Sequence, residues 1–224
     1  MVDLKVTTTG MEVFTQLRKM GPEGAEAIAR SINRTTQKGK SIITADVAKT
    51  YNIAEEKVKK TLRKDTAATA QRLEGSIIST SRTIPLFEFA GLPREPYSGG
   101  PRPKGASVNV MGARKWVHQY PAHPAQFAFI ARMASGHVGI FARTGEFGRR
   151  PKPKIKQTGN VTTVRLSESK KLEKIGGLYS LSVPKMIEAE KVYSRIYLGL
   201  QELLNIETDK ELKKTIKKLG ITLT

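Results

Sequence analysis

The chain has 224 residues, with 39 Lys and Arg against 20 Asp and Glu and no cysteine, which gives a formal net charge of +19. Without cysteine it forms no disulfide and no zinc–thiolate site, and no apolar run reaches the roughly 20 residues that span a membrane. Charges at Asp3 and Lys5 stand where a signal peptide would be apolar, so we expect a protein assembled inside the cell.

The first elements that the pattern predicts are a strand and two helices. Residues 2–6 alternate apolar and polar side chains, as in a strand with one buried face. A helix that carries Met11, Phe14 and Leu17 on one face is expected next, ended by Gly21-Pro22. A longer helix begins at Pro22, because proline suits the first turn, and Gly39 is a candidate interruption of its apolar stripe.

A third helix is expected from Asn52, since Asn52 and Glu55 have the spacing of a capping box, and it would continue through Leu62. Residues 47–62 as a whole have the look of a helix-turn-helix, which leaves a DNA-binding protein as an alternative function. Against this alternative, Glu55 and Glu56 would open the recognition helix with two carboxylates that repel phosphates. Two packed amphipathic helices would show the same pattern for packing reasons alone.

Between the helical ends the sequence predicts antiparallel strands joined by loops. Ile, Ser and Thr predict an extended chain over 74–89, in which Pro85 is confined to a strand end or edge. Further strands are expected over 107–111 and 161–166, and irregular chain over 91–105, 114–124 and 145–156.

The clearest strand pattern lies in residues 127–144, where two apolar runs flank Ser135-Gly136. A two-residue turn at this pair predicts a hairpin. One face would hold the apolar pairs Met133–Val138, Ala131–Ile140 and Phe129–Ala142, and the other the pairs Ala134–His137, Arg132–Gly139, Ile130–Phe141 and Ala128–Arg143. A one-residue slip would exchange the two faces, so the pattern is expected to fix the register.

The C-terminal part is predicted to be helical. Pro184 opens a helix with an apolar stripe over 186–203, and a second capping box, Thr208-x-x-Glu211, predicts a separate final helix that ends at Gly220. The order of elements predicts an α+β fold with N-terminal helices, a central antiparallel sheet with long basic Pro/Gly-rich loops, and C-terminal helices. We expect one domain over 1–224, mainly helical over 1–70, with strands and loops over 71–166 and helices over 184–220.

Positive charge is concentrated in the middle of the chain. Eleven basic residues and one acidic residue, Glu146, lie between Gly99 and Lys156, so this segment carries +10 of the net charge. Such a field favours nucleic acid, anionic proteins or lipid surfaces, and a solvated basic surface is the simpler interpretation. The candidate DNA- or partner-facing residues are Arg102, Lys104, Arg114, Lys115, Arg143, Arg149, Arg150, Lys152, Lys154 and Lys156.

The sequence contains no catalytic motif. His118, His123 and His137 lack the H-E-x-x-H spacing of a zinc site, and neither a phosphate-binding glycine motif nor G-x-S-x-G occurs. We therefore expect no enzymatic activity, no cofactor and no bound metal. A nuclease whose acidic site is assembled by the fold is a third alternative.

Several short segments of the chain follow one another in the order seen in a known protein family. They are Ala27–Arg34, Val47-Ala48-Lys49 leading to Val58 and Leu62, Ile84-Pro85-Leu86-x-x-Phe89, Ser107-Val108-x-Val110, Phe141-x-Arg143, Ile155-Lys156-Gln157 and Ser182–Ile187. In this order they resemble the minor tail protein Z family, the tail-completion proteins of lambda-like long-tailed bacteriophages. The resemblance covers roughly residues 20–200, and it is interrupted by Thr158–Tyr179, an extra hairpin or extension in this chain.

The resemblance implies a structural virion protein that completes the head-proximal end of the tail, at the neck/tail junction, as a ring adaptor around the DNA channel. The ring would be a six-fold homo-oligomer, with tail terminator and neck or connector proteins as partners. Genomic DNA would pass through its lumen without sequence-specific contact. The protein would be assembled in the host cytoplasm and reside in the virion, with no membrane partner. The resemblance carries over no catalytic residues.

Overall fold

The computed structural model describes residues 2–7, 19–97, 104–119, 123–133, 135–148 and 172–219. It shows helices at both ends and antiparallel strands between them, so the predicted α+β class is confirmed. Contacts divide the chain into two compact units, where the sequence analysis treats 1–224 as one domain. Unit 1 comprises Met1–Ile84, Val110–Gly112 and Ser180–Thr224, and unit 2 comprises Pro85–Asn109 and Ala113–Tyr179.

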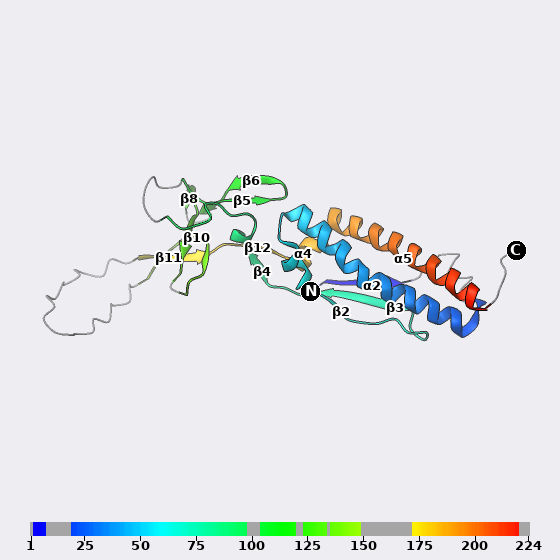
Figure 1. The fold of residues 1–224 in the computed structure, drawn as a ribbon. Coiled ribbons are helices and arrows are strands. Elements are labelled where there is room, and N and C mark those ends of the chain that lie inside the picture. Colours follow the sequence, from blue (N-terminus) through cyan, green and yellow to red (C-terminus); the bar gives the residue numbers. More distant parts are fainter. Residues whose placement is uncertain are drawn as a thin grey trace, which may run out of the picture. The chain divides into compact units, whose positions relative to one another are not determined.

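Two long helices dominate unit 1. Helix α2 spans Gly21–Tyr51 and helix α5 spans Glu190–Leu219, and the two lie side by side along most of their length (Figure 1). They run antiparallel, since Arg30 of α2 bonds Glu211 near the end of α5 and Asp46 bonds Arg195 near its start. At about 1.5 Å per residue each helix is about 45 Å long, so their shared seam supplies most of this unit's core.

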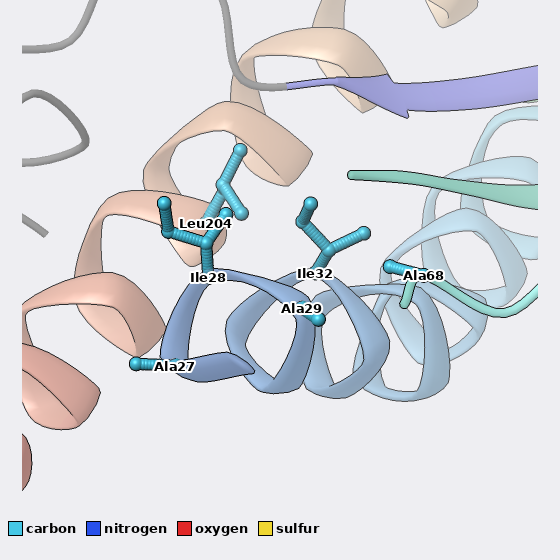
Figure 2. Packing of buried hydrophobic residues seen from close by; sticks show 6 residues of the cluster. All are labelled: Ala27, Ile28, Ala29, Ile32, Ala68 and Leu204. Atoms are coloured by element: carbon cyan, nitrogen blue, oxygen red, sulfur yellow. The ribbon is translucent and has the colours of Figure 1, made fainter. Parts of the chain in front are cut away.

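The seam is packed with small and β-branched side chains. Ile28 and Ile32 project from the same side of α2, and Leu204 of α5 and Ala68 belong to the same buried cluster (Figure 2). All four are at least 95% buried. Burying a side chain of this size stabilises the fold by about 1.5–3 kcal/mol, so this cluster is a large part of what holds the helices together.

Gly39 does not interrupt α2, contrary to the expectation. A Cβ atom at this position would overlap the end of the Leu200 side chain on α5. Glycine therefore stands here because it lets the two helices approach closely, although it lowers helix propensity by about 1 kcal/mol relative to alanine.

Helix α5 is continuous where a second capping box was expected. Thr208 donates its hydroxyl hydrogen to the Leu204 carbonyl inside the helix, and Glu211 faces α2 instead of an N-terminus. The C-terminal helical region is instead interrupted near its start, at Ala189, an extended residue between α4 (Val183–Glu188) and α5. Pro184 does stand in the first turn of α4, as predicted.

Two buried carboxylates of α5 form the polar part of the interface between α2 and α5. Glu207 and Glu211 are side chains only 2% and 3% exposed, and each is held by cations whose own ends reach solvent. Lys38 lies 2.7 Å from Glu207, Arg30 lies 2.9 Å from Glu211, and Arg34 bonds the same carboxylate. The cations stand at every fourth residue of α2, so they form one line that matches the two carboxylates of α5.

A three-stranded antiparallel sheet packs against α2. Strand β3 (Glu74–Ser79) lies between β1 (Val2–Thr7) and β2 (Leu62–Lys64). The strands predicted over 2–6 and within 74–89 are confirmed. Helix α3 covers only Glu55–Lys59.

The prediction that Asn52 caps the start of a third helix is wrong. Asn52 adopts the left-handed conformation, with φ 55° and ψ 46°, and its N–H bonds the Ala48 carbonyl, so it ends α2 instead of opening α3. Asparagine tolerates this conformation better than most residues. The residue that precedes α3 is Ala54, and Leu62 begins β2 instead of continuing the helix.

Unit 2 is built on the long strand β10 (Val138–Gly148), which lies between β9 (Phe129–Arg132) and β11 (Leu172–Gly177). The hairpin of β9 and β10 is confirmed, but its register is one residue away from the predicted one. Observed pairs are Arg132–Val138, Ala131–Gly139, Ile130–Ile140 and Phe129–Phe141.

The turn explains the shift in register. Met133 and His137 flank the loop, and Gly136, at φ 83°, donates its N–H to the Met133 carbonyl, so the loop is one residue longer than the predicted turn. The pattern could not correct this, because Ile140, Phe141 and Ala142 are all buried and both faces of β10 are therefore covered.

More of unit 2 is extended than the sequence predicts. Beyond β5 (Ser107–Val110), which was expected, the segment 114–124 holds β6 (Ala113–Trp116), β7 (His118–Gln119) and the start of β8 (His123–Phe127), and 145–148 belongs to β10.

Pro85 ends β4 (Thr83–Pro85), as predicted, and β4 pairs with β12 (Tyr179–Ser182). Residues 86–88 form a short 3₁₀ helix instead of extended chain. Two predictions fall outside the described residues: the apolar face of the first helix, made of Met11, Phe14 and Leu17, and the strand over 161–166.

Replacing the central carboxylate of the helix pair should destabilise the protein. Glu211→Gln keeps the volume but loses charged hydrogen bonds to Arg30 and Arg34, and we expect unfolding by urea to require about 1.5–3 kcal/mol less free energy. Glu202→Gln, on an exposed position of the same helix, is the matched control and should change stability by less than about 0.5 kcal/mol. Equal losses in the two variants would contradict the assignment of Glu211 to the seam.

Stability should also depend on pH in the acid range. A hydrogen bond from Lys38 lowers the pKa of Glu207 below 4.5. Burial raises the pKa of Glu211, but its hydrogen bonds to Arg30 and Lys214 and the charge of Arg34 outweigh burial and leave that pKa lowered too. Depressed carboxylate pKa values give stability that is complete above the unfolded-state pKa and is lost as the pH falls through the folded-state pKa.

We therefore expect the contribution of these two groups to the urea midpoint to be flat from about pH 7 to pH 5 and to fall below about pH 4.5. The Glu207→Gln/Glu211→Gln variant should lose part of that acid dependence. An unchanged slope between pH 5 and pH 3 in the double variant would show that other groups cause the acid sensitivity.

Candidate functional site

Four of the ten candidate basic residues lie in the described chain, and all four belong to unit 2. They are Lys104, Arg114, Lys115 and Arg143. The other six, Arg102, Arg149, Arg150, Lys152, Lys154 and Lys156, lie outside the described residues.

Arg114 and Arg143 are partly engaged in holding unit 2 together. The Arg114 guanidinium donates to the Ala90 carbonyl at 3.1 Å and to the Ser107 hydroxyl at 3.3 Å. Arg143 lies 3.8 Å from the Glu173 carboxylate and 5.8 Å from the centre of the Phe129 ring. Both side chains remain exposed, so they add positive charge to the surface while they brace neighbouring segments.

Lys104 lies in a cluster of aromatic side chains that the sequence analysis did not predict. Its ammonium lies 5.2 Å from the centre of the Phe127 ring and 5.7 Å from that of Trp116. Phe127 in turn contacts Trp116, at 5.4 Å between ring centres, and His118, at 4.6 Å. We call Lys104, Trp116, His118 and Phe127 the aromatic–lysine cluster.

Backbone pairing brings the members of this cluster together from three segments. Ala106 donates to the Ala128 carbonyl at 2.7 Å, Val117 donates to Ala106 at 2.9 Å, and Ala128 donates to Val117 at 2.6 Å. Each bond lies within two residues of a cluster member in sequence. At Gly105 a Cβ atom would overlap Phe127, so only glycine allows the segment of Lys104 to run so close to the aromatic ring.

A buried amide joins the strands of the cluster to the main sheet. Gln119 is 4% exposed, donates from its side chain to the Phe127 carbonyl at 2.8 Å, and accepts the backbone N–H of Arg143 at 2.9 Å. One side chain thus satisfies a carbonyl after β8 and an N–H of β10. It thereby holds the strands that carry Phe127 and His118 against β10.

The sequence analysis gives no role to Trp116, the only tryptophan of the chain. The available signal was the alternation of Arg114, Trp116 and His118, which is typical of one face of a strand. That signal was lost because the segment was expected to be irregular. The partners of Trp116 come from distant positions, and no local spacing relates them.

The helix-turn-helix alternative rests on residues 47–62, which lie in unit 1. Val47, Ala48, Ile53 and Val58 are buried there, as packing requires. Helix α3 has five residues and is followed directly by a strand, so the long recognition helix that this alternative needs is not formed.

No set of three or more His, Asp or Glu side chains in the described ranges lies close enough together to hold a metal ion. Every helix in the described chain is too short or too polar to cross a bilayer. Comparison with known protein families, with curated proteins and with solved structures gives no match.

The role of Gln119 can be tested directly. Gln119→Leu keeps the volume but leaves the Phe127 carbonyl and the Arg143 N–H without their partner, and two buried polar groups left unpaired should cost about 1–3 kcal/mol of unfolding free energy. The emission of Trp116 should also change, since the strands that carry its neighbours lose their anchor. Gln201→Leu, exposed on α5, is the control and should alter neither property; matching effects would refute the bridging role.

Proposed function

We propose that this protein is a non-enzymatic structural protein of a tailed bacteriophage, which completes the head-proximal end of the tail as an oligomeric ring adaptor. The proposal starts from the ordered segments that resemble the minor tail protein Z family. The α+β order of helices, antiparallel strands and helices agrees with it. Tail terminator and neck or connector proteins would be the partners, and the ring would be six-fold.

The observation that carries the proposal furthest is the distribution of charge between the two units. Unit 2 holds 16 Lys and Arg against five Asp and Glu in the sequence, a net +11 of the total +19. The cations of unit 1 that face the seam are in part matched by buried carboxylates. An adaptor around a DNA channel needs such a non-specific positive surface, because phosphate contacts attract DNA without reading its sequence.

The same surface favours this function over a sequence-reading regulator. Direct readout needs an element that enters the major groove with side chains on base edges. The stretch with that pattern in the sequence folds as a short helix and a strand beside α2. Positive charge in a chain whose described residues form no DNA-reading element fits a DNA conduit better than a sequence-specific regulator.

Particle composition tests the proposal. Mass spectrometry of purified particles from the phage that encodes the chain should find the protein at a constant ratio to the tail-tube protein, consistent with one ring per tail. Disrupting the gene should leave heads and tails that do not join into infectious particles. Purified protein added to such an extract should restore infectivity. Absence of the chain from particles would overturn the proposal.

Charge variants refine this test. Lys104→Glu/Lys115→Glu reverses two exposed cations of unit 2, and we expect it to restore infectivity at least about ten-fold less well than the parent protein. Lys213→Glu/Lys217→Glu, which reverses two exposed cations of α5, should restore it fully. Equal activity of the two variants would show that the charge of unit 2 is only a solvated surface.

A further inference from the structure

The single tryptophan of the chain stands in an unusual place. Trp116 is 47% exposed, at the end of a strand whose four residues are all exposed, while the described cores are filled by Ile, Val, Leu, Met, Phe and Ala. A large aromatic ring on a surface loses the burial that would otherwise stabilise it. Its ring is instead kept in a defined position by Phe127 and covered in part by the ammonium of Lys104.

The arrangement matches the chemistry of an unpaired nucleic-acid strand. Nucleobases stack on exposed aromatic rings whatever their identity, and nearby cations bind the phosphates that link them. In the aromatic–lysine cluster the Phe127 ring contacts both Trp116 and His118, and the ammonium of Lys104 lies over the rings of Trp116 and Phe127. A duplex hides the faces of its bases inside the stack, so it can use only the cations of this surface.

The surrounding charge points to the same class of ligand. Unit 2 is strongly basic, so a polyanion is attracted over a range of about 8–10 Å at physiological salt. An acidic polypeptide would use the charge but has no flat π system to place on Trp116. The combination of rings and cations therefore favours nucleic acid over an acidic protein.

We propose that the aromatic–lysine cluster binds unpaired nucleic acid, with a base stacked on Trp116 and a neighbouring phosphate held by Lys104. The site acts without sequence preference, because stacking and phosphate contacts do not read base edges. This binding goes beyond the tail function proposed above and does not depend on it. It is measured on the purified chain alone, whereas the tail function is measured by the composition of particles.

Trp116 is itself the probe. Its fluorescence should be quenched when an oligothymidylate of about 12 nucleotides is added, a length within the usual range for such sites. An abasic oligomer with the same number of phosphates, a duplex of the same length and polyglutamate should bind more weakly, by at least about ten-fold for the abasic oligomer. An oligodeoxyuridylate and an oligouridylate of the same length, which differ only in the sugar, are titrated in parallel, and the tighter of the two identifies the natural form.

Variants are compared by the anisotropy of a labelled oligothymidylate. Trp116→Leu keeps an apolar contact with Phe127 but removes the π face, and it should weaken binding roughly ten- to one-hundred-fold. Trp116→Phe should restore most of the affinity. Lys104→Gln should lower the slope of log affinity against log salt by about 0.7, as expected for one lost phosphate contact on a single strand.

The controls separate this site from general charge and from misfolding. Tyr197→Ala removes a comparably exposed aromatic of unit 1, 53% exposed, and Lys59→Gln removes an exposed cation of α3; neither should weaken binding by more than about two-fold. Thermal melting by circular dichroism checks that each variant is folded. Unchanged affinity of Trp116→Leu, equal affinity for the abasic oligomer, or no binding of the oligothymidylate would each overturn the proposal.

Discussion

The ion pairs buried between α2 and α5 are the constraint on which unit 1 depends. Two carboxylates that are almost fully buried, Glu207 and Glu211, must remain paired, because an unpaired buried charge is far more costly than the pair is favourable. Pairing them with Arg30, Arg34 and Lys38 fixes the antiparallel alignment of the two helices along their axes.

This alignment then decides where close packing is required. It places Leu200 against Gly39, and it brings Leu204 into one buried cluster with Ile28 and Ile32. The sheet of β1, β2 and β3 covers another side of α2, where Gly75 lies against Ile32 and Thr36. Hydrophobic burial supplies most of the stabilisation, while the charges select one arrangement among several that would bury similar area.

Unit 2 is organised on a different principle. Apart from β10 its strands are short, and much of its cohesion comes from single polar bridges such as Gln119 and Arg114 and from rings in contact. This leaves cations and aromatic groups at the surface instead of in a core. The proposed roles in tail assembly and in binding unpaired nucleic acid both draw on this surface, the first through its charge and the second through the geometry of four side chains.

The sequence by itself determined the α+β class, the first strand, the long helix from Pro22, the start at Pro184 and the hairpin, because each is encoded by local periodicity and by proline or glycine at a fixed place. It also located the positive charge. Tertiary structure decided what local spacing cannot express. Asn52 and Glu55, and likewise Thr208 and Glu211, have the spacing of helix caps. Asn52 nevertheless ends α2, through its left-handed conformation and a bond to Ala48. Glu211 pairs with α2, because cations distant in the chain compete for its carboxylate. The hairpin register followed from the backbone conformation of Gly136, and Lys104, Trp116 and Phe127 met only because three separate segments hydrogen-bond to one another.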